Sequence, residues 1–341
     1  MKTAFLNMKK CVNNQICKEN FANVCNNTGN NVFCNGLEKI FECDSIFPGE
    51  LSNVADEYDN FITAAFIWIR ENDDKSSFSR TLNLIKNKPV IPISVGLQCK
   101  EFNSDFKMHP ATVKILADMA ERATLAVRGE YTAEILNKYK IKNIQIIGCP
   151  SMYTELNPNK KIEKKPQSQI NKIICNYRTI SKDLTYKDYQ VLQYLNSYST
   201  LFIEQTVSYL PVEYYKFIPK EVTWLLTKKK RIYFKFEDWY NVVKRFDFSI
   251  GARFHGNMIS LLAGVPSLFL TFDSRTKELT DFFKLPTLSI EDFDICKPIM
   301  YYYEKADYSE FNKNYNKLFN DFLKFAKKNK LTIRKKSDDS L

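Results

Sequence analysis

Short apolar runs alternate along residues 1–155 with segments whose apolar residues recur every three or four positions. The runs have the length of buried strands, and the segments have the period of amphipathic helices. Strands are expected at 3–7, 89–96, 124–129 and within 144–153, with a further buried run at 61–69. Helices are expected at 32–41, 111–123 and 130–139. This alternation predicts a parallel sheet covered by helices on both faces.

The same alternation starts again after residue 170. Strands are expected at 172–178, 199–205, 231–236, 247–252 and 267–272. Helices are expected at 185–197, 237–246 and 275–283, with a long amphipathic helix from about Tyr308 to Lys330. The second half of the chain therefore predicts another parallel α/β unit.

A lysine-rich stretch with two prolines, "LNPNKKIEKKPQSQ", separates the two halves and is the best candidate for a linker. We expect a first α/β domain at 1–155, a linker at 156–170, a second α/β domain at 171–306, and a helix with a basic tail at 307–341. Two such domains leave a cleft between them. In open α/β sheets ligands bind beyond the carboxyl ends of the strands, so candidate chemistry is sought there.

Charge and cysteine content limit the class of protein. The net charge of +11 favours an anionic partner, although solvated lysine clusters would give the same value. Helix-turn-helix, zinc-finger and RNA-binding aromatic motifs are missing from the sequence, which disfavours a nucleic-acid binder. Nine cysteines without a C-x-x-C pair and only two histidines favour reduced thiols over a metal or disulfide cluster.

The apolar stretches are shorter than the ~20 residues that cross a bilayer, and the chain does not start with an apolar signal core. We therefore expect a soluble or peripheral protein.

The stretch "GARFHGNMISLLAGVP" (251–266) carries the clearest chemistry. It follows the expected strand 247–252 and places Arg253, His255 and Asn257 on a strand-to-helix turn. A helix N-terminus presents free N–H groups there, and a guanidinium suits a carboxylate or phosphate. Histidine adds a proton donor or acceptor near neutral pH. The turn predicts an anion site with an acid/base group. A buried histidine bonded to backbone is the alternative for His255.

These residues resemble the signature of the polysaccharide pyruvyltransferase family. The resemblance rests on R-F-H-G-N-M at 253–258, L-A-G-V-P at 262–266 and D-S-R-T at 273–276, followed by Glu278 and Leu279. Weaker similarity, in the same order as in the family, lies in "NTGNN", "ISVGL", "LAVRGEYTAEIL" and "IIGCPSMY". One departure is Asn30, where many members have an aspartate. We therefore expect Asn30 to hold a loop or bind substrate.

The resemblance implies a GT-B-like architecture, in which two Rossmann-like domains face each other across a cleft. It implies transfer of pyruvate from phosphoenolpyruvate (PEP) to two sugar hydroxyls, which gives a cyclic ketal in a cell-surface glycan or its lipid-linked precursor. The first domain would take the acceptor and the second PEP. A GT-B glycosyltransferase with a nucleotide-sugar donor is the alternative function.

The resemblance also suggests roles for single residues. His255 is the expected general acid/base. Arg253 is expected to act in catalysis and, with Arg178, to anchor PEP. The further candidates for substrate binding are Arg275, Lys235, Asn257 and Asn30. Arg275 has a surface position as its alternative. Arg128 could meet the acceptor or a structural carboxylate, and the structural role is favoured.

Neither a metal nor a cofactor is expected. The family implies a cytoplasmic enzyme. Its basic clusters fit either peripheral contact with the inner face of the membrane, where a polyprenyl-diphosphate-linked acceptor would lie, or simple solvation. The sequence does not determine the acceptor sugar, the hydroxyl pair, the ketal stereochemistry or the oligomeric state.

Overall fold

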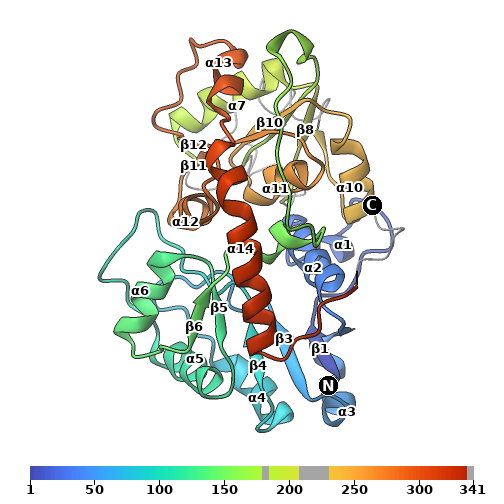
Figure 1. Cartoon of the computed structure of the whole chain (residues 1–341), viewed down its shortest axis with the longest axis vertical. Coiled ribbons are helices and arrows are strands. Elements are labelled where there is room, and N and C mark those ends of the chain that lie inside the picture. The colour runs from blue at the N-terminus through green and yellow to red at the C-terminus, as the bar shows by residue number, and fades with distance from the viewer. Residues whose placement is uncertain (179–183, 207–229, 336–341) are drawn as a thin grey trace.

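The computed structural model describes residues 1–178, 184–206 and 230–335 of the chain. The expected α/β class is confirmed, since parallel sheets occupy both halves of the molecule (Figure 1). Each half is Rossmann-like, and the two face each other as in the GT-B arrangement. The carboxyl ends of both sets of strands contribute to the boundary between the halves.

The first half contains a four-stranded sheet in the order β2-β1-β3-β4, with every pair parallel. A parallel pair, β5 and β6, adjoins it through a bridge between Val95 and Val127. The strands are β1 Thr3–Leu6, β2 Asp44–Ile46, β3 Asn60–Thr63, β4 Val90–Pro92, β5 Leu125–Val127 and β6 Ile144–Ile146. The helices are α1 Lys18–Asn23, α2 Gly29–Ile40, α3 Leu51–Val54, α4 Ser79–Ile85, α5 Pro110–Arg122 and α6 Glu130–Lys138.

The second half contains a parallel sheet in the order β9-β8-β7-β10-β11-β12. This is the doubly wound order, and its direction reverses between β7 and β10. The strands are β7 Ile173–Asn176, β8 Leu201–Ile203, β9 Lys230–Arg231, β10 Phe248–Gly251, β11 Ser267–Thr271 and β12 Thr287–Ser289. The helices are α7 Tyr186–Tyr198, α10 Phe236–Val243, α11 Phe254–Leu262, α12 Ser274–Phe283, α13 Ile299–Lys305 and α14 Ser309–Lys328.

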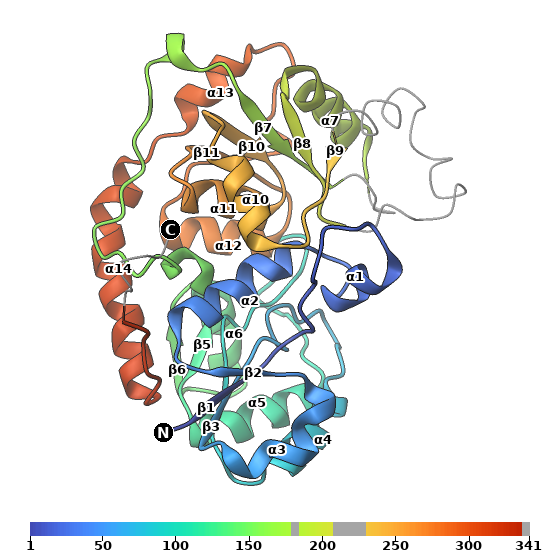
Figure 2. The same cartoon turned by 90° about the vertical axis from the view of Figure 1, so that its right-hand side faces the viewer.

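Two segments tie the halves together. Helix α2 lies at the boundary and packs against α10 and α11 of the second half (Figure 2). Helix α14 runs from the second half along the first (Figure 1), and the ring of its Phe322 stacks on Tyr153 with centroids 4.4 Å apart. One hydrophobic core therefore includes side chains from both halves.

The expected linker 156–170 packs against the chain rather than standing clear of it. Ile162 is buried, and its backbone N–H donates to Asn312 Oδ1 of α14 at 2.8 Å. Lys164 Nζ donates to the Tyr303 carbonyl at 2.7 Å. The expected C-terminal helix is confirmed as α14, while residues 336–341 of the basic tail lie outside the described residues. Within the described ranges, no helix has the length and apolarity to cross a membrane.

A candidate active site where the two sheets meet

Asn176 and Arg253 meet where the strand order reverses, between the ends of β7 and β10. Asn176 Oδ1 accepts the backbone N–H of Arg253 at 2.8 Å, and its carbonyl accepts the N–H of Ala252 at 3.1 Å. A Cβ atom on Gly251 would lie 1.8 Å from that carbonyl oxygen, so only glycine fits. This contact fixes Arg253 at the N-cap of α11, as the expected strand-to-helix turn requires.

Asn257 lies beneath this turn and is fully buried. Its Oδ1 accepts hydrogen bonds from Asn176 Nδ2 at 2.8 Å and Ser249 Oγ at 2.9 Å, and its Nδ2 donates to the Gly251 carbonyl at 2.8 Å. The side chain thus joins β7, β10 and α11. A substrate contact through Asn257 stays a prediction, and one of these bonds would have to open for it.

His255 occupies the first turn of α11. Its Nε2 lies 3.6 Å from Cys149 Sγ. Gly29, the first residue of α2, packs against His255, since a Cβ atom on Gly29 would lie 3.1 Å from His255 Cβ. Burial, and then the positive charges of Arg275 and Arg128, lower the pKa of His255 to about 3. The imidazole is therefore neutral at neutral pH in the free protein.

Three arginines at the boundary of the two halves have side-chain N–H groups that are buried without a hydrogen-bond partner among the described residues. These groups are Nε and Nη1 of Arg128, Nε of Arg178 and Nε of Arg253. Leaving a buried donor unpaired costs about 1–3 kcal/mol, and more for a charged group. Arg128 comes from the first half and is only 3% exposed, so the cluster draws on both halves.

Carboxylates orient two of these guanidinium groups. Arg178 Nη2 donates to Asp188 Oδ1 at 3.0 Å, and its guanidinium carbon lies 4.2 Å from the Phe272 ring centroid. Arg253 Nη2 donates to Thr206 Oγ1 at 2.9 Å and lies 3.8 Å from Glu204 Oε1. In each case one edge of the guanidinium is held by protein while Nε remains unpaired.

Arg275 lies in the first turn of α12, with its Nε 3.9 Å from Asp273 Oδ2. Its positive charge acts on the other members of the cluster. Burial and then repulsion by Arg275 lower the pKa of Arg128 to about 10. The pKa of Arg253 is lowered by burial in the first place, with Arg275 and Arg178 contributing and Glu204 opposing the shift. The site therefore favours a ligand with more than one negative charge.

Lys235 and Asn30 have their own contacts away from the arginines. Lys235 precedes α10, is 41% exposed at its side chain, and has its Nζ 3.9 Å from Asp238 Oδ2. Asn30 Nδ2 donates to the Val24 carbonyl at 2.9 Å, which holds the turn before α2. Substrate binding by Lys235 or Asn30 stays a prediction, while the loop role expected as one option for Asn30 is seen.

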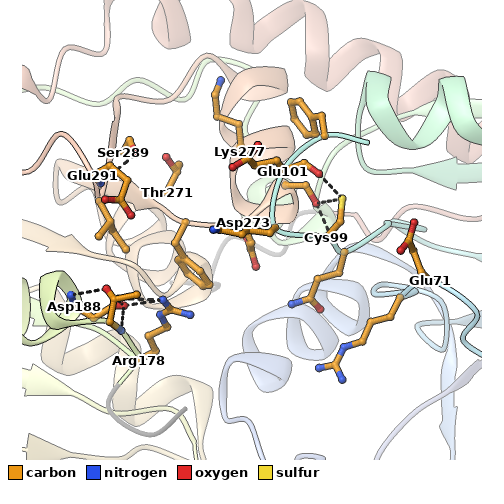
Figure 3. A pocket seen from close by; sticks show the side chains of 18 residues that line it. Glu71, Cys99, Glu101, Arg178, Asp188, Thr271, Asp273, Lys277, Ser289 and Glu291 are labelled. Carbon is orange, nitrogen blue, oxygen red and sulfur yellow. Dashed lines mark hydrogen bonds and ion pairs between the residues drawn. The ribbon is translucent and has the colours of Figure 1, made fainter. Parts of the chain in front are cut away.

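A cavity of about 1160 Å³ adjoins the arginine cluster between the two halves (Figure 3). Residues 98–102 line it from the first half, and Arg178, Asp273 and Ser274 line it from the second. The halves contact each other at its wall, where the Cys99 N–H donates to Ser274 Oγ at 3.0 Å and the Ser274 N–H donates to the Cys99 carbonyl at 3.1 Å. The predicted cleft at the strand ends is confirmed.

A family model described as polysaccharide pyruvyl transferase matches residues 27–274, which is most of the chain. The chain belongs to this family. Family membership supports a transferase that acts in the pyruvylation of a polysaccharide, and the matched range contains Arg128, Arg178, Arg253 and His255. No sequence among the curated proteins matches the chain.

Several solved structures are similar in fold. A UDP-GlcNAc 2-epimerase from Methanocaldococcus jannaschii is 10% identical with a TM-score of 0.47, covering 96% of this chain and 99% of that one. The corresponding enzyme from Neisseria meningitidis is 11% identical with a TM-score of 0.44, covering 95% and 100%. A putative UDP-N-acetylglucosamine 2-epimerase from Listeria monocytogenes is 12% identical with a TM-score of 0.46, covering 81% and 76%.

Cys149 and Gln205, two members of the candidate site, are not among the residues that the sequence predicts there. Cys149 lies beside His255, and burial is the main cause that raises the pKa of its thiol. Gln205 is buried just beyond β8, and its Nε2 has no partner among the described residues. For Arg128 the sequence favours a structural role. The strand-end rule points to Gln205 and Arg128, because each lies at the carboxyl end of an expected strand, but it does not show that their side chains converge.

All nine cysteines of this transferase are free thiols, as expected for a reduced protein. In the parts of the chain that the structure describes, no three His, Cys, Asp or Glu side chains gather as metal ligands would. A reaction without metal or cofactor stays a prediction.

Proposed function

We propose that the protein transfers pyruvate from PEP to two hydroxyls of a sugar in a surface polysaccharide or its lipid-linked precursor, forming a cyclic ketal and releasing phosphate. The observation that carries this proposal is the set of unpaired, buried N–H groups on Arg128, Arg178 and Arg253. Arg128 also acts on the pKa of His255, and Arg178 on that of Arg253. PEP carries a carboxylate and a phosphate, so it supplies acceptors for donors on several sides at once. No cofactor is needed besides PEP as co-substrate.

The arginines and two helix N-termini would bind and polarise PEP. Arg253 and Arg178 hold the carboxylate and phosphate, and Arg128 closes the site from the first half. Arg275 and the N-termini of α11 and α12 stabilise the charge that develops on the departing phosphate. These donors are already oriented by the protein, so little reorganisation is required during the reaction.

His255 would supply the proton. Burial is the main cause that lowers the pKa of His255, and the charges of Arg275 and Arg128 add to it. The anionic charge of bound PEP would offset these charges and so would raise the pKa, which favours uptake of a proton by the imidazole. The imidazolium donates this proton to the methylene carbon, C2 becomes oxocarbenium-like, and a sugar hydroxyl attacks it. Phosphate leaves, and the second hydroxyl closes the ring. Of the two hydroxyl protons, one replaces the proton given to the new methyl group and one leaves on phosphate.

The proposal includes a cellular location for the protein and a lipid-linked acceptor. A donor drawn from central metabolism implies a cytoplasmic enzyme, and a polyprenyl-diphosphate-linked acceptor would bring it to the inner face of the cytoplasmic membrane. The lysines at the end of α14, Lys327 and Lys328, fit contact with an anionic lipid surface.

Ligand-induced stabilisation of the purified protein tests the donor. PEP should raise the unfolding temperature, since a ligand at 100 times its Kd stabilises by about 2.7 kcal/mol. UDP-sugars should have a smaller effect. Arg128→Met should remove the PEP effect, whereas Arg245→Met, at an exposed arginine, should retain it. Stabilisation by UDP-sugars without a response to PEP would instead support the glycosyltransferase alternative.

A further inference from the structure

Asp273 places one carboxylate oxygen between the arginine cluster and the cavity. The residue is 7% exposed, and its Oδ1 accepts the Thr276 N–H at 2.8 Å as the N-cap of α12. Its Oδ2 is buried and accepts no hydrogen bond from the described residues, with Arg275 Nε 3.9 Å away. Asp273 lies on the cavity wall between Arg178 and Cys99 (Figure 3). A buried acceptor with an unused lone pair is therefore available to a ligand in this cavity.

The charges that line the cavity disfavour a nucleotide diphosphate. Four basic side chains and five acidic ones contribute to the lining. Two of the basic groups already have partners, since Arg178 pairs with Asp188 and Lys277 with Asp281. A diphosphate needs several free cations, whereas hydroxyl groups of a neutral sugar can bond to carboxylates and to cations alike. The balance of charge thus favours an uncharged, hydroxyl-rich ligand.

Aromatic rings and hydroxyl groups complete a lining suited to a sugar. Phe102 lines the cavity from the first half, is 48% exposed, and stacks on Tyr131 with centroids 4.9 Å apart. Phe272 lines it from the second half, with Thr271 and Ser289 nearby on the same wall. Apolar faces of sugar rings pack on such aromatic rings, while their edges reach polar groups. The volume of about 1160 Å³ exceeds the ~300–1,000 Å³ of common ligand pockets, which leaves room for more than one sugar ring.

We propose that this cavity is the acceptor subsite, that it binds a neutral glycan, and that Asp273 Oδ2 accepts the proton of the attacking hydroxyl. The inference rests on the proposed function. As the hydroxyl oxygen forms its bond to C2 of the pyruvyl group, its proton passes to Asp273, and the carboxyl group then returns that proton to the departing phosphate. The Asp273 charge acts on the pKa of both Arg253 and Arg128, which places it next to the groups that would hold PEP.

Asp273→Asn separates catalysis from donor binding. Asparagine retains an oxygen that can cap α12, so the fold should survive. We expect PEP to stabilise this variant as it does the wild type, while the kcat for ketal formation falls by ~10²-fold or more, as for loss of a general base. Wild-type kcat in Asp273→Asn would overturn the role of Asp273. Failure of PEP to stabilise the wild-type protein would instead contradict the proposed donor, a separate result.

Phe102→Ala tests the location of the acceptor without altering the N-cap of α12. Phe47→Ala is the matched control, because Phe47 is 40% exposed and does not line the cavity. Saturation-transfer NMR with methyl glycosides of common hexoses and N-acetylhexosamines detects binding directly. We expect Phe102→Ala, but not Phe47→Ala, to weaken these signals several-fold while leaving PEP stabilisation unchanged. Equal signals in both variants, or displacement of the glycosides by UDP, would overturn the acceptor subsite.

Discussion

Glu278 of α12 accepts two hydrogen bonds from Thr132 of α6, from the backbone N–H at 2.7 Å and from the hydroxyl at 2.9 Å. The carboxylate thereby caps a helix of the other half, beside the buried Arg128. A Cβ atom on Gly129 would lie 2.4 Å from Glu278 Cγ, so the approach also requires glycine. The segment that follows Asp273 therefore fastens the two halves together around the site.

The Glu278 contact should make stability depend on pH. Burial is the main cause that raises the pKa of Glu278 from 4.5 to about 7, so the folded state holds this proton more tightly than the unfolded state. The stabilisation from the protonated Glu278 is complete below pH 4.5 and is lost as the pH rises through 7. The free energy of unfolding should fall by up to about 3 kcal/mol over this range. Glu278→Gln should remove this dependence. The free energy of unfolding of both proteins is measured by denaturant between pH 4.5 and 8. His255 is present in both, so its contribution to the pH dependence cancels in the comparison. Parallel pH profiles of the two proteins would contradict the assignment to Glu278.

PEP binding should be accompanied by proton uptake. Burial, and then the charges of Arg275 and Arg128, lower the pKa of His255 to about 3 in the free protein. The negative charge of bound PEP would counteract the two arginine charges and raise this pKa. Calorimetry at pH 6.5 in buffers of different ionisation enthalpy should give an uptake of up to one proton that disappears in His255→Asn. An uptake that persists in His255→Asn would assign the proton to another group.

Arg253→Lys should raise the KM for PEP by ~10-fold or more, because lysine keeps the charge but loses the planar fork. The same substitution at the exposed Arg245 serves as control and should leave KM unchanged. Lys235→Ala should change KM less than Arg253→Lys does, since Lys235 pairs with Asp238 at the start of α10. A larger effect at Lys235 would show that it contributes to the donor site more than Arg253 does.

The regular parts of the fold were accessible to sequence reasoning. Gly264 follows α11 with a φ of +76°, as is typical of a glycine just beyond a helix end. The expected strand 231–236 is wrong beyond Arg231, where β9 ends. Its apolar residues Ile232 and Phe234 pack instead with Phe21 and Val24, near α1. Alternation alone does not reveal which element covers a run of apolar residues, so contacts distant in sequence override the local pattern.

The residues of the candidate site also differ in whether local sequence predicts them. Position at a strand-to-helix turn predicts Arg253 and His255 as site residues, because that rule depends only on local sequence, and the family resemblance adds Arg178. The N-cap of α12 is Asp273, which the segment D-S-R-T does not by itself distinguish from Ser274. The convergence of Arg128 on the arginines of the second half depends on how the two halves pack, which no local pattern encodes.

The most direct test of the central claim is a coupled measurement of phosphate release and product mass. Wild-type protein and His255→Ala are incubated with PEP and a panel of neutral glycan precursors. We predict that the wild type releases one phosphate for each glycan that gains a pyruvate ketal, and that His255→Ala, folded as judged by its unfolding temperature, loses at least ~10²-fold of this activity. Ketal formation by His255→Ala at the wild-type rate, or release of phosphate without any ketal product, would contradict the account.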